Sequence, residues 1–220
     1  MDKGSFHKLV VEIIKSAIIK NVKKEYTLDK NKIFVTEVTG CIRQSFFNRI
    51  FLGELNYNAA FRILRGVLLH EWLAEKLPIG LDEVRNRDQL RGEIDLGNGA
   101  MLVGRADYLI GDYIVELKTT SRRKLEKPLD EHVKQVMLYM HMFNKEKGII
   151  IYLHDNGNIT SFTINKEDDL IKELIEKARK LFSSLKSGHA PKAEIGQYCR
   201  WCPWNRKDFC EEGVKFSQSL

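Results

Sequence analysis

The chain has 220 residues, which suits one domain with a modest appendage, and its 43% hydrophobic and 30% charged residues are ordinary for a globular protein. A formal net charge of +6 permits a polyanionic partner without requiring one. The apolar stretch from Leu9 to Ile19 is interrupted by Glu12 and Lys15, so it is too short and too charged to span a bilayer or to serve as a secretory signal. We therefore expect a cytoplasmic protein with no membrane partner.

Periodicity and turn residues predict helices that alternate with strands along the chain. Helices are expected over residues 5–24, 42–51, 58–77, 129–145 and 167–186, with Asn165 as the cap of the last one. Strands are expected over residues 33–38, within 91–118, and over 148–154 and 159–164. This alternation predicts an α/β fold with a mixed central sheet flanked by helices, followed by a small cysteine-rich C-terminal module.

A predicted hairpin places acidic residues opposite one another. If Gly111-Asp112 forms a two-residue turn, Tyr108 faces Val115 and Asp107 faces Glu116. Facing side chains lie about 5 Å apart, and Lys118 shares the face of Glu116 because strand side chains alternate. Two facing carboxylates repel unless a cation or a proton lies between them, and oxygen ligands suit Mg²⁺ or Mn²⁺. A solvated acidic pair that uses Lys118 as its ion-pair partner is the structural alternative, and a longer turn would break the register.

Two helices carry further candidate residues. His70 lies on the apolar face of the 58–77 helix, where Gly66, one turn earlier, would allow close backbone approach. A histidine in such a face is more often an ordinary core residue, but the carboxylate pair makes a metal-binding role for His70 reasonable. Gln135 and Tyr139 lie four residues apart on the next helix and share a face, which by itself indicates only a polar edge.

The cysteines predict a metal site, with Cys41 as either a ligand or a bystander, and four ordinary thiols are the structural alternative. Cys199 and Cys202 are separated by two residues, Cys210 follows after seven intervening residues, and Cys41 would tie the N-terminal region to the tail. In an intracellular protein such cysteines are more often thiols or metal ligands than disulfides. The spacing does not separate zinc from iron, since four thiolates serve both, and the nearby aromatic residues Trp201, Trp204 and Phe209 would shield either.

Taken together, these features resemble the RecB-like nucleases of the PD-(D/E)xK superfamily, and within them the fourth CRISPR-associated (Cas) family of exonucleases. The resemblance runs from Cys41 to Cys210. Its elements, in chain order, are an early cysteine, Arg65-Gly66 with His70, Gly104-x-x-Asp107, Glu116-Leu117-Lys118, Gln135-x-x-x-Tyr139 and three late cysteines. Ala106 replaces the proline of the superfamily name, and the interval from Cys202 to Cys210 is slightly long for the family.

The resemblance implies a restriction-endonuclease-like core that hydrolyses phosphodiester bonds of DNA, with preference for single strands or free ends, in CRISPR spacer acquisition. It implies that His70, Asp107, Glu116 and the Leu117 carbonyl hold Mg²⁺ or Mn²⁺. Lys118, Gln135 and Tyr139 complete the catalytic set, and Arg43, Arg49 and Arg105 are candidate phosphate contacts. The four cysteines are expected to hold an iron–sulfur cluster, [4Fe–4S] in preference to [2Fe–2S].

The implied organisation has three parts: an N-terminal helical segment over residues 1–40, a nuclease core over 41–187, and a cluster module over 188–220 that Cys41 closes. CRISPR integrase proteins and further copies of the chain are the expected protein partners. Alternatives are a repair or recombination nuclease, a non-catalytic protein that presents DNA ends to the integrase, and a zinc-containing nucleic-acid-binding protein.

Overall fold

The computed structural model describes residues 3–22, 29–51, 57–76 and 90–218 of the chain. Within these residues seven strands form two sheets, with orders β1-β3-β2 and β4-β5-β6-β7. The strands are β1 (Lys32–Phe34), β2 (Arg91–Gly97), β3 (Ala100–Arg105), β4 (Tyr108–Ile110), β5 (Tyr113–Thr120), β6 (Lys147–His154) and β7 (Ile159–Asn165). Each sheet is mixed, because β1 runs parallel to β3 and β5 runs parallel to β6 while the other neighbours are antiparallel.

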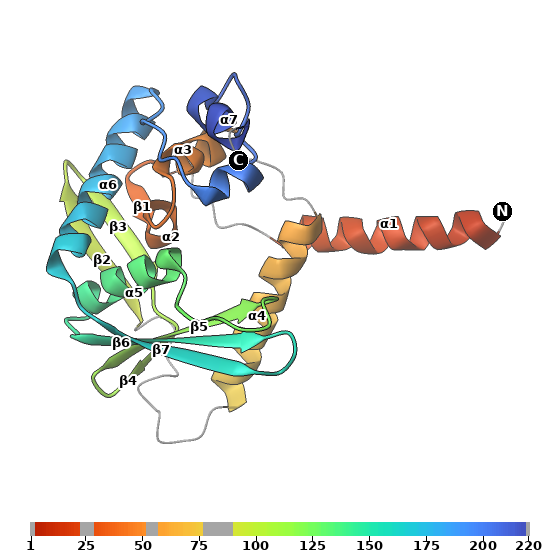
Figure 1. Cartoon of the computed structure of the whole chain (residues 1–220), viewed down its shortest axis with the longest axis horizontal. Helices are drawn as coiled ribbons and strands as arrows, with labels where there is room; N and C mark the ends of the chain where they lie inside the picture. Colours follow the sequence, from red (N-terminus) through yellow and green to blue (C-terminus); the bar gives the residue numbers. More distant parts are fainter. Residues whose placement is uncertain (1–2, 23–28, 52–56, 77–89, 219–220) are drawn as a thin grey trace.

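Helices surround both sheets, and α1 extends away from the rest of the molecule (Figure 1). They are α1 (Lys3–Asn21), α2 (Val35–Val38), α3 (Ile42–Phe51), α4 (Tyr57–Lys76), α5 (Asp130–Met142), α6 (Asp168–Ser187), the 3-10 helix η2 (Gln197–Trp201) and α7 (Glu211–Gln218). No described helix combines the length and the apolar character that crossing a membrane requires.

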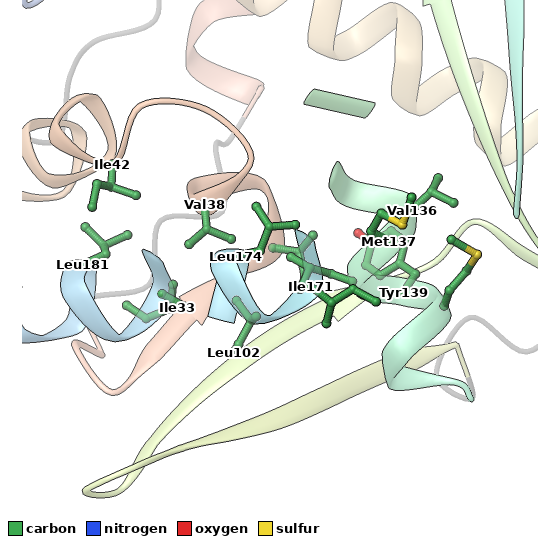
Figure 2. Packing of buried hydrophobic residues seen from close by; sticks show 14 of the residues in the cluster. Ile33, Val38, Ile42, Leu102, Val136, Met137, Tyr139, Ile171, Leu174 and Leu181 are labelled. Atoms are coloured by element: carbon green, nitrogen blue, oxygen red, sulfur yellow. The ribbon is translucent and has the colours of Figure 1, made fainter. Parts of the chain in front are cut away.

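The main hydrophobic core lies where α5 and α6 meet the two sheets. Leu102 of β3, Met137 of α5 and Leu174 of α6 are buried in it, and Figure 2 shows their side chains packed together. A second, smaller cluster covers the other face of the β4–β5 hairpin, where Leu73 of α4 packs against Tyr108 and the strand residues beside it. The hairpin is thus held between α5 and α4, so side chains at its end can meet residues from both helices.

The α/β class, with mixed strands between helices, is confirmed, but the strands divide into two sheets instead of one central sheet. The chain passes from the first sheet to the second between Arg105 and Tyr108, so Asp107 lies at the junction. The expected strand over 33–38 is half wrong, because α2 begins at Val35. The carboxylate of Glu37 accepts the backbone N–H of Phe34 at 2.8 Å, and this local cap favours a helical turn over the β propensity of the segment. Asn165 ends β7 and does not cap α6, which begins at Asp168.

Two glycines of the predicted motifs have opposite surroundings. A methyl group at Gly104 would lie 2.6 Å from both Tyr139 and Val35, whereas the space around Gly66 is open to 4 Å among the described atoms. Among the described residues, therefore, no backbone approaches Gly66 closely.

We expect Gly104→Ala to lower the free energy of unfolding by about 1–3 kcal/mol, because the new methyl group must displace a buried ring or Val35. Gly66→Ala is the matched control, and we expect it to raise that free energy by about 0.5–1 kcal/mol, since alanine is the better helix former. Urea unfolding of both variants measures the difference. Equal stability of Gly104→Ala and the wild type would contradict the packing described for Tyr139.

Candidate active site

The β4–β5 hairpin has the predicted register. Tyr108 pairs with Val115, Leu109 with Ile114 and Ile110 with Tyr113, across the two-residue connection Gly111-Asp112. Gly111 has a φ of 57°, in the region that tight turns require and that glycine adopts without strain. The strand following this turn therefore carries Glu116, Leu117 and Lys118 past the end of β4, beside Asp107.

Asp107 is fixed at this position by two bonds. Its Oδ2 atom accepts the backbone N–H of Leu117 at 2.9 Å, and its Oδ1 atom lies 3.1 Å from Nδ1 of His70. The first bond ties the junction of the two sheets to β5. The second brings α4 to the hairpin, so the half-buried face of α4 that carries His70 points to the acidic residues, as its periodicity predicted.

Glu116 and Lys118 form a buried ion pair on one face of β5. The Lys118 ammonium donates to Oε1 of Glu116 at 2.7 Å and to Oε1 of Gln135 on α5 at 2.8 Å. Burial raises the pKa of Glu116 from 4.5 to about 7, Lys118 opposes this rise, and the nearby charge of Asp107 adds to it. Burial lowers the pKa of Lys118, but the charges of Glu116 and Asp107 raise it more, so the ammonium stays protonated.

Gln135 and Tyr139, which their spacing alone did not distinguish from a polar helix edge, both belong to this network. The Gln135 amide nitrogen donates to the Tyr139 hydroxyl at 3.0 Å, while its oxygen accepts from Lys118. Both side chains are buried. Burial first, and then the charge of Glu116, raises the pKa of Tyr139, so its hydroxyl stays neutral. These hydrogen bonds fix the orientation of the Gln135 amide. Gln135 thus binds the Lys118 ammonium from α5, while Glu116 binds it from β5.

Sequence reasoning missed two residues that lie behind Lys118. Tyr152 of β6 is the register partner of Lys118, and its hydroxyl accepts the Leu129 N–H at 3.0 Å and lies 2.8 Å from Nδ1 of His132. Burial, followed by the charge of Lys118, lowers the pKa of His132 to about 3, so its ring is neutral. The position of His132, one helical turn before Gln135, is the signal that could have identified it.

The donor set suits a hard cation, although each ligand is already engaged within the protein. In the part of the chain that the structure describes, no group of three or more His, Cys, Asp or Glu side chains is arranged so that it could hold a metal ion. Two buried side-chain acceptors have no hydrogen-bond partner in the described residues, and one of them lies in this site: the Oε2 atom of Glu116, a residue that is 2% exposed. A buried carboxylate oxygen without a donor is costly, and a cation is one partner that offsets this cost.

The four cysteines lie around one cavity of about 370 Å³, far apart in sequence and close in space. Cys41 precedes α3, Cys199 lies in η2, Cys202 directly follows η2, and Cys210 precedes α7. Burial raises the pKa of the Cys202 thiol, and the charges of the other three cysteines raise it further, which reflects their mutual proximity. Thiolates are common ligands of zinc and of iron–sulfur clusters, although in the described residues the four side chains are not arranged as a metal site.

The tail that carries three of these cysteines docks on α3. Arg43 donates to the carbonyls of Phe209 and Pro191 at 2.7 and 2.9 Å, and the Trp204 indole donates to Asn48 at 2.8 Å. Rings from both segments also pack together, at centroid distances of 5.1 to 5.6 Å. Hydrogen bonds and ring contacts therefore connect α3 directly to the tail.

These contacts correct three expectations. Arg43 is occupied by tail carbonyls, and Arg49 forms a buried ion pair with Glu37 at 2.6 Å, so neither is available as a phosphate contact. Arg105 is exposed. Trp201 is 71% exposed and does not shield the cysteines, whereas Trp204 and Phe209 are half-buried in the ring cluster.

Residues 5–210 match the model of the PD-(D/E)XK nuclease superfamily, and the chain belongs to this superfamily. Within it, the chain is similar to the CRISPR-associated exonuclease Cas4 of Saccharolobus solfataricus, with 28% identity over 151 residues, which are 64% of this chain and 72% of that protein. The crystal structure of SSO0001 has the same fold, with a TM-score of 0.60 and 24% identity over 91% of this chain and 96% of that one. The expected fold and the resemblance to a RecB-like nuclease are confirmed.

The raised pKa of Glu116 makes stability depend on pH. The folded state favours the protonated form of the Glu116 carboxyl. The stability that this protonated carboxyl contributes is therefore complete below the unfolded pKa of 4.5 and is lost as the pH rises through about 7. In the presence of a chelator we expect Glu116→Gln to be more stable than the wild type by on the order of 3 kcal/mol at about pH 8, with the difference vanishing near pH 4. Thermal unfolding across this range measures it, and a constant difference at all pH values would contradict the burial of Glu116.

Proposed function

We propose that the chain is a metal-dependent DNA exonuclease that hydrolyses phosphodiester bonds, prefers single strands and works in CRISPR spacer acquisition. One observation carries the proposal: Asp107, Glu116 and Lys118 meet at the end of one hairpin within a PD-(D/E)XK nuclease fold. The similarity to Cas4, described as an exonuclease, supports the choice of reaction. The integrase proteins and further copies of the chain are the proposed partners, in the cytoplasm.

Asp107 and Glu116, with His70 and the Leu117 carbonyl, are the residues that would hold Mg²⁺ or Mn²⁺. When bound, such an ion polarises the scissile phosphate and lowers the pKa of a coordinated water molecule toward neutrality. Two observations support this assignment. The Oε2 atom of Glu116 has no hydrogen-bond partner among the described residues, and His70 and Asp107 pair with each other, so these two ligands lie side by side.

Lys118 stabilises charge at the reacting phosphate. Its ammonium is protonated and fixed by Glu116 and Gln135, so it requires no reorganisation when negative charge develops on the phosphate oxygens. One of its three N–H groups remains beyond these two bonds and can donate to the phosphate or to the attacking water. Gln135 is thus a positioning residue for Lys118, and Tyr139 in turn orients the amide of Gln135.

We expect Asp107→Ala and Lys118→Ala each to reduce cleavage by about 10²–10³-fold or more, because each removes a charged group from the reacting centre. Asp112→Ala is the matched control, since Asp112 is an exposed acidic residue at the other end of the same hairpin. The assay follows end-labelled single-stranded DNA with Mn²⁺ or Mg²⁺. Undiminished wild-type cleavage in excess chelator would refute the metal mechanism, and an active Lys118→Ala variant would refute the role of the ammonium.

We further propose that Cys41, Cys199, Cys202 and Cys210 hold an iron–sulfur cluster, [4Fe–4S] in preference to [2Fe–2S], which closes residues 188–220 onto the nuclease core of residues 41–187. The N-terminal segment, 1–40, contributes β1 to the first sheet. Hydrolysis transfers no electrons, so the cluster is assigned a structural role. The placement of all four thiols around one cavity supports this assignment.

Protein purified without oxygen should be brown and absorb in the visible range, and Cys202→Ala should weaken this absorption and lower the melting temperature. Trp201→Ala is the control, because Trp201 is the exposed neighbour of Cys202 and should leave the spectrum unchanged. Colourless protein that contains stoichiometric zinc would overturn the iron assignment while leaving a metal site. Protein without either metal would overturn the site itself.

A further inference from the structure

The loop between β5 and α5 joins the two elements that carry the candidate active site. Lys118 lies two residues before the end of β5 at Thr120, and Gln135 lies in the second turn of α5, which begins at Asp130. Residues 121–127 directly follow β5, so in the proposed function they are next along the chain to the residues that would face a nucleic-acid strand bound at Lys118. The chemistry of this loop therefore bears on how such a strand is held.

The loop is strongly basic over residues 121–127. It carries four basic residues and one acidic residue, all exposed: Arg122, Arg123, Lys124, Glu126 and Lys127. The one ion pair among them, between Lys124 and Glu126 at 3.8 Å, is highly exposed and therefore weak. Within the part of the chain that the structure describes, neither guanidinium of Arg122 and Arg123 has an ion-pair partner. Two arginine side chains are thus available to an external anion.

The backbone of the loop is held in place from three sides. The ring of His154, which is buried, lies with Nδ1 2.5 Å from the Arg122 carbonyl and Nε2 2.8 Å from the Thr160 hydroxyl. Since a carbonyl only accepts, Nδ1 donates to Arg122 and the Thr160 hydroxyl can donate to Nε2. The Arg122 N–H donates to the Thr120 hydroxyl at 3.2 Å, and Leu125 is buried in the main core.

This anchoring distinguishes the loop from an ordinary solvated charge run. A buried histidine bonded to the carbonyl of Arg122, with a leucine anchor three residues further on, fixes the chain direction while the basic side chains point outward. Such pre-organisation reduces the entropy lost when a ligand binds. The exposed residues of the loop include no aromatic or large apolar side chain, so it offers neither base stacking nor membrane insertion.

We propose that residues 121–127 form a binding site for the phosphate backbone of the nucleic-acid strand, with Arg122 and Arg123 as its principal contacts. The inference rests on the proposed function, because it assigns the loop to the same substrate. Contacts to phosphate fix the position of a strand without reading its sequence. The loop therefore contributes affinity and direction of approach, independent of base composition.

The test measures binding of dye-labelled oligothymidylate by fluorescence anisotropy, with the full-length protein in a chelator, at several KCl concentrations. For single strands each phosphate contact contributes about 0.7 to the slope of log affinity against log salt, so Arg122→Gln with Arg123→Gln should reduce the slope by about 1.4. With equal affinities at about 1 M salt, this change corresponds to roughly 70-fold weaker binding at about 50 mM salt. The double variant with Arg122→Lys and Arg123→Lys should retain the slope, because the charge is kept.

Lys172→Gln with Lys180→Gln is the matched control, since it removes the same charge from exposed positions on α6. An unchanged slope in the arginine-to-glutamine variant, or an equal loss in the α6 control, would overturn the proposal. Loss of the slope in the lysine variant would do so too, because it would indicate a structural role for the arginines. Cleavage by wild-type protein is measured in parallel, so that a wild type that neither binds nor cleaves DNA identifies a failure of the proposed function instead.

Discussion

The hydrogen bond from the backbone N–H of Leu117 to the carboxylate of Asp107 holds the candidate site together. Asp107 lies where the chain passes from the first sheet to the second. This bond attaches that junction to β5, the strand that carries Glu116 and Lys118. It becomes available because the turn at Gly111 sets the register of β4 and β5. A shift of one residue would turn Glu116 and Lys118 to the α4 side and leave Asp107 without its partner.

Burial of charge at this position has opposite consequences for stability and for chemistry. Glu116 is almost completely removed from water, and the Lys118 ion pair compensates only one of its oxygens. Desolvation of a buried ion pair often costs as much as the pair contributes, so the cluster adds little to the stability of the fold. The same low-polarity surroundings strengthen the interaction of the ammonium with an incoming phosphate.

Local rules were sufficient for the parts of the site that are close in sequence. The Gly111-Asp112 turn predicted the register, and alternation along β5 predicted that Glu116 and Lys118 share a face. The contact of His70 with Asp107 joins elements far apart in the chain, so no spacing fixed it. The apolar helix face and the carboxylate pair made a metal-binding role for His70 reasonable, the family resemblance implied it, and the fold brings the two side chains together. The roles of Arg43 and Arg49 were missed because a basic residue has the same sequence signature whether it binds a phosphate or a buried carbonyl. The short helix α2 was missed because the cap formed by Glu37 outweighs the propensity of its valines.

Helix α5 physically connects the two groups of candidate residues. Its first turns line the cysteine cavity with Asp130, Glu131 and Lys134, and Gln135 follows immediately in the active-site network. Glu131 and Gln135 are one turn apart, so the cavity lining and the amide that binds Lys118 belong to one continuous stretch of helix. Arg43 and the ring cluster dock the tail on α3. These contacts position the tail residues that line the cysteine cavity. Under the proposed function, a centre bound by the four thiols would therefore lie beside the same helix whose Gln135 positions Lys118.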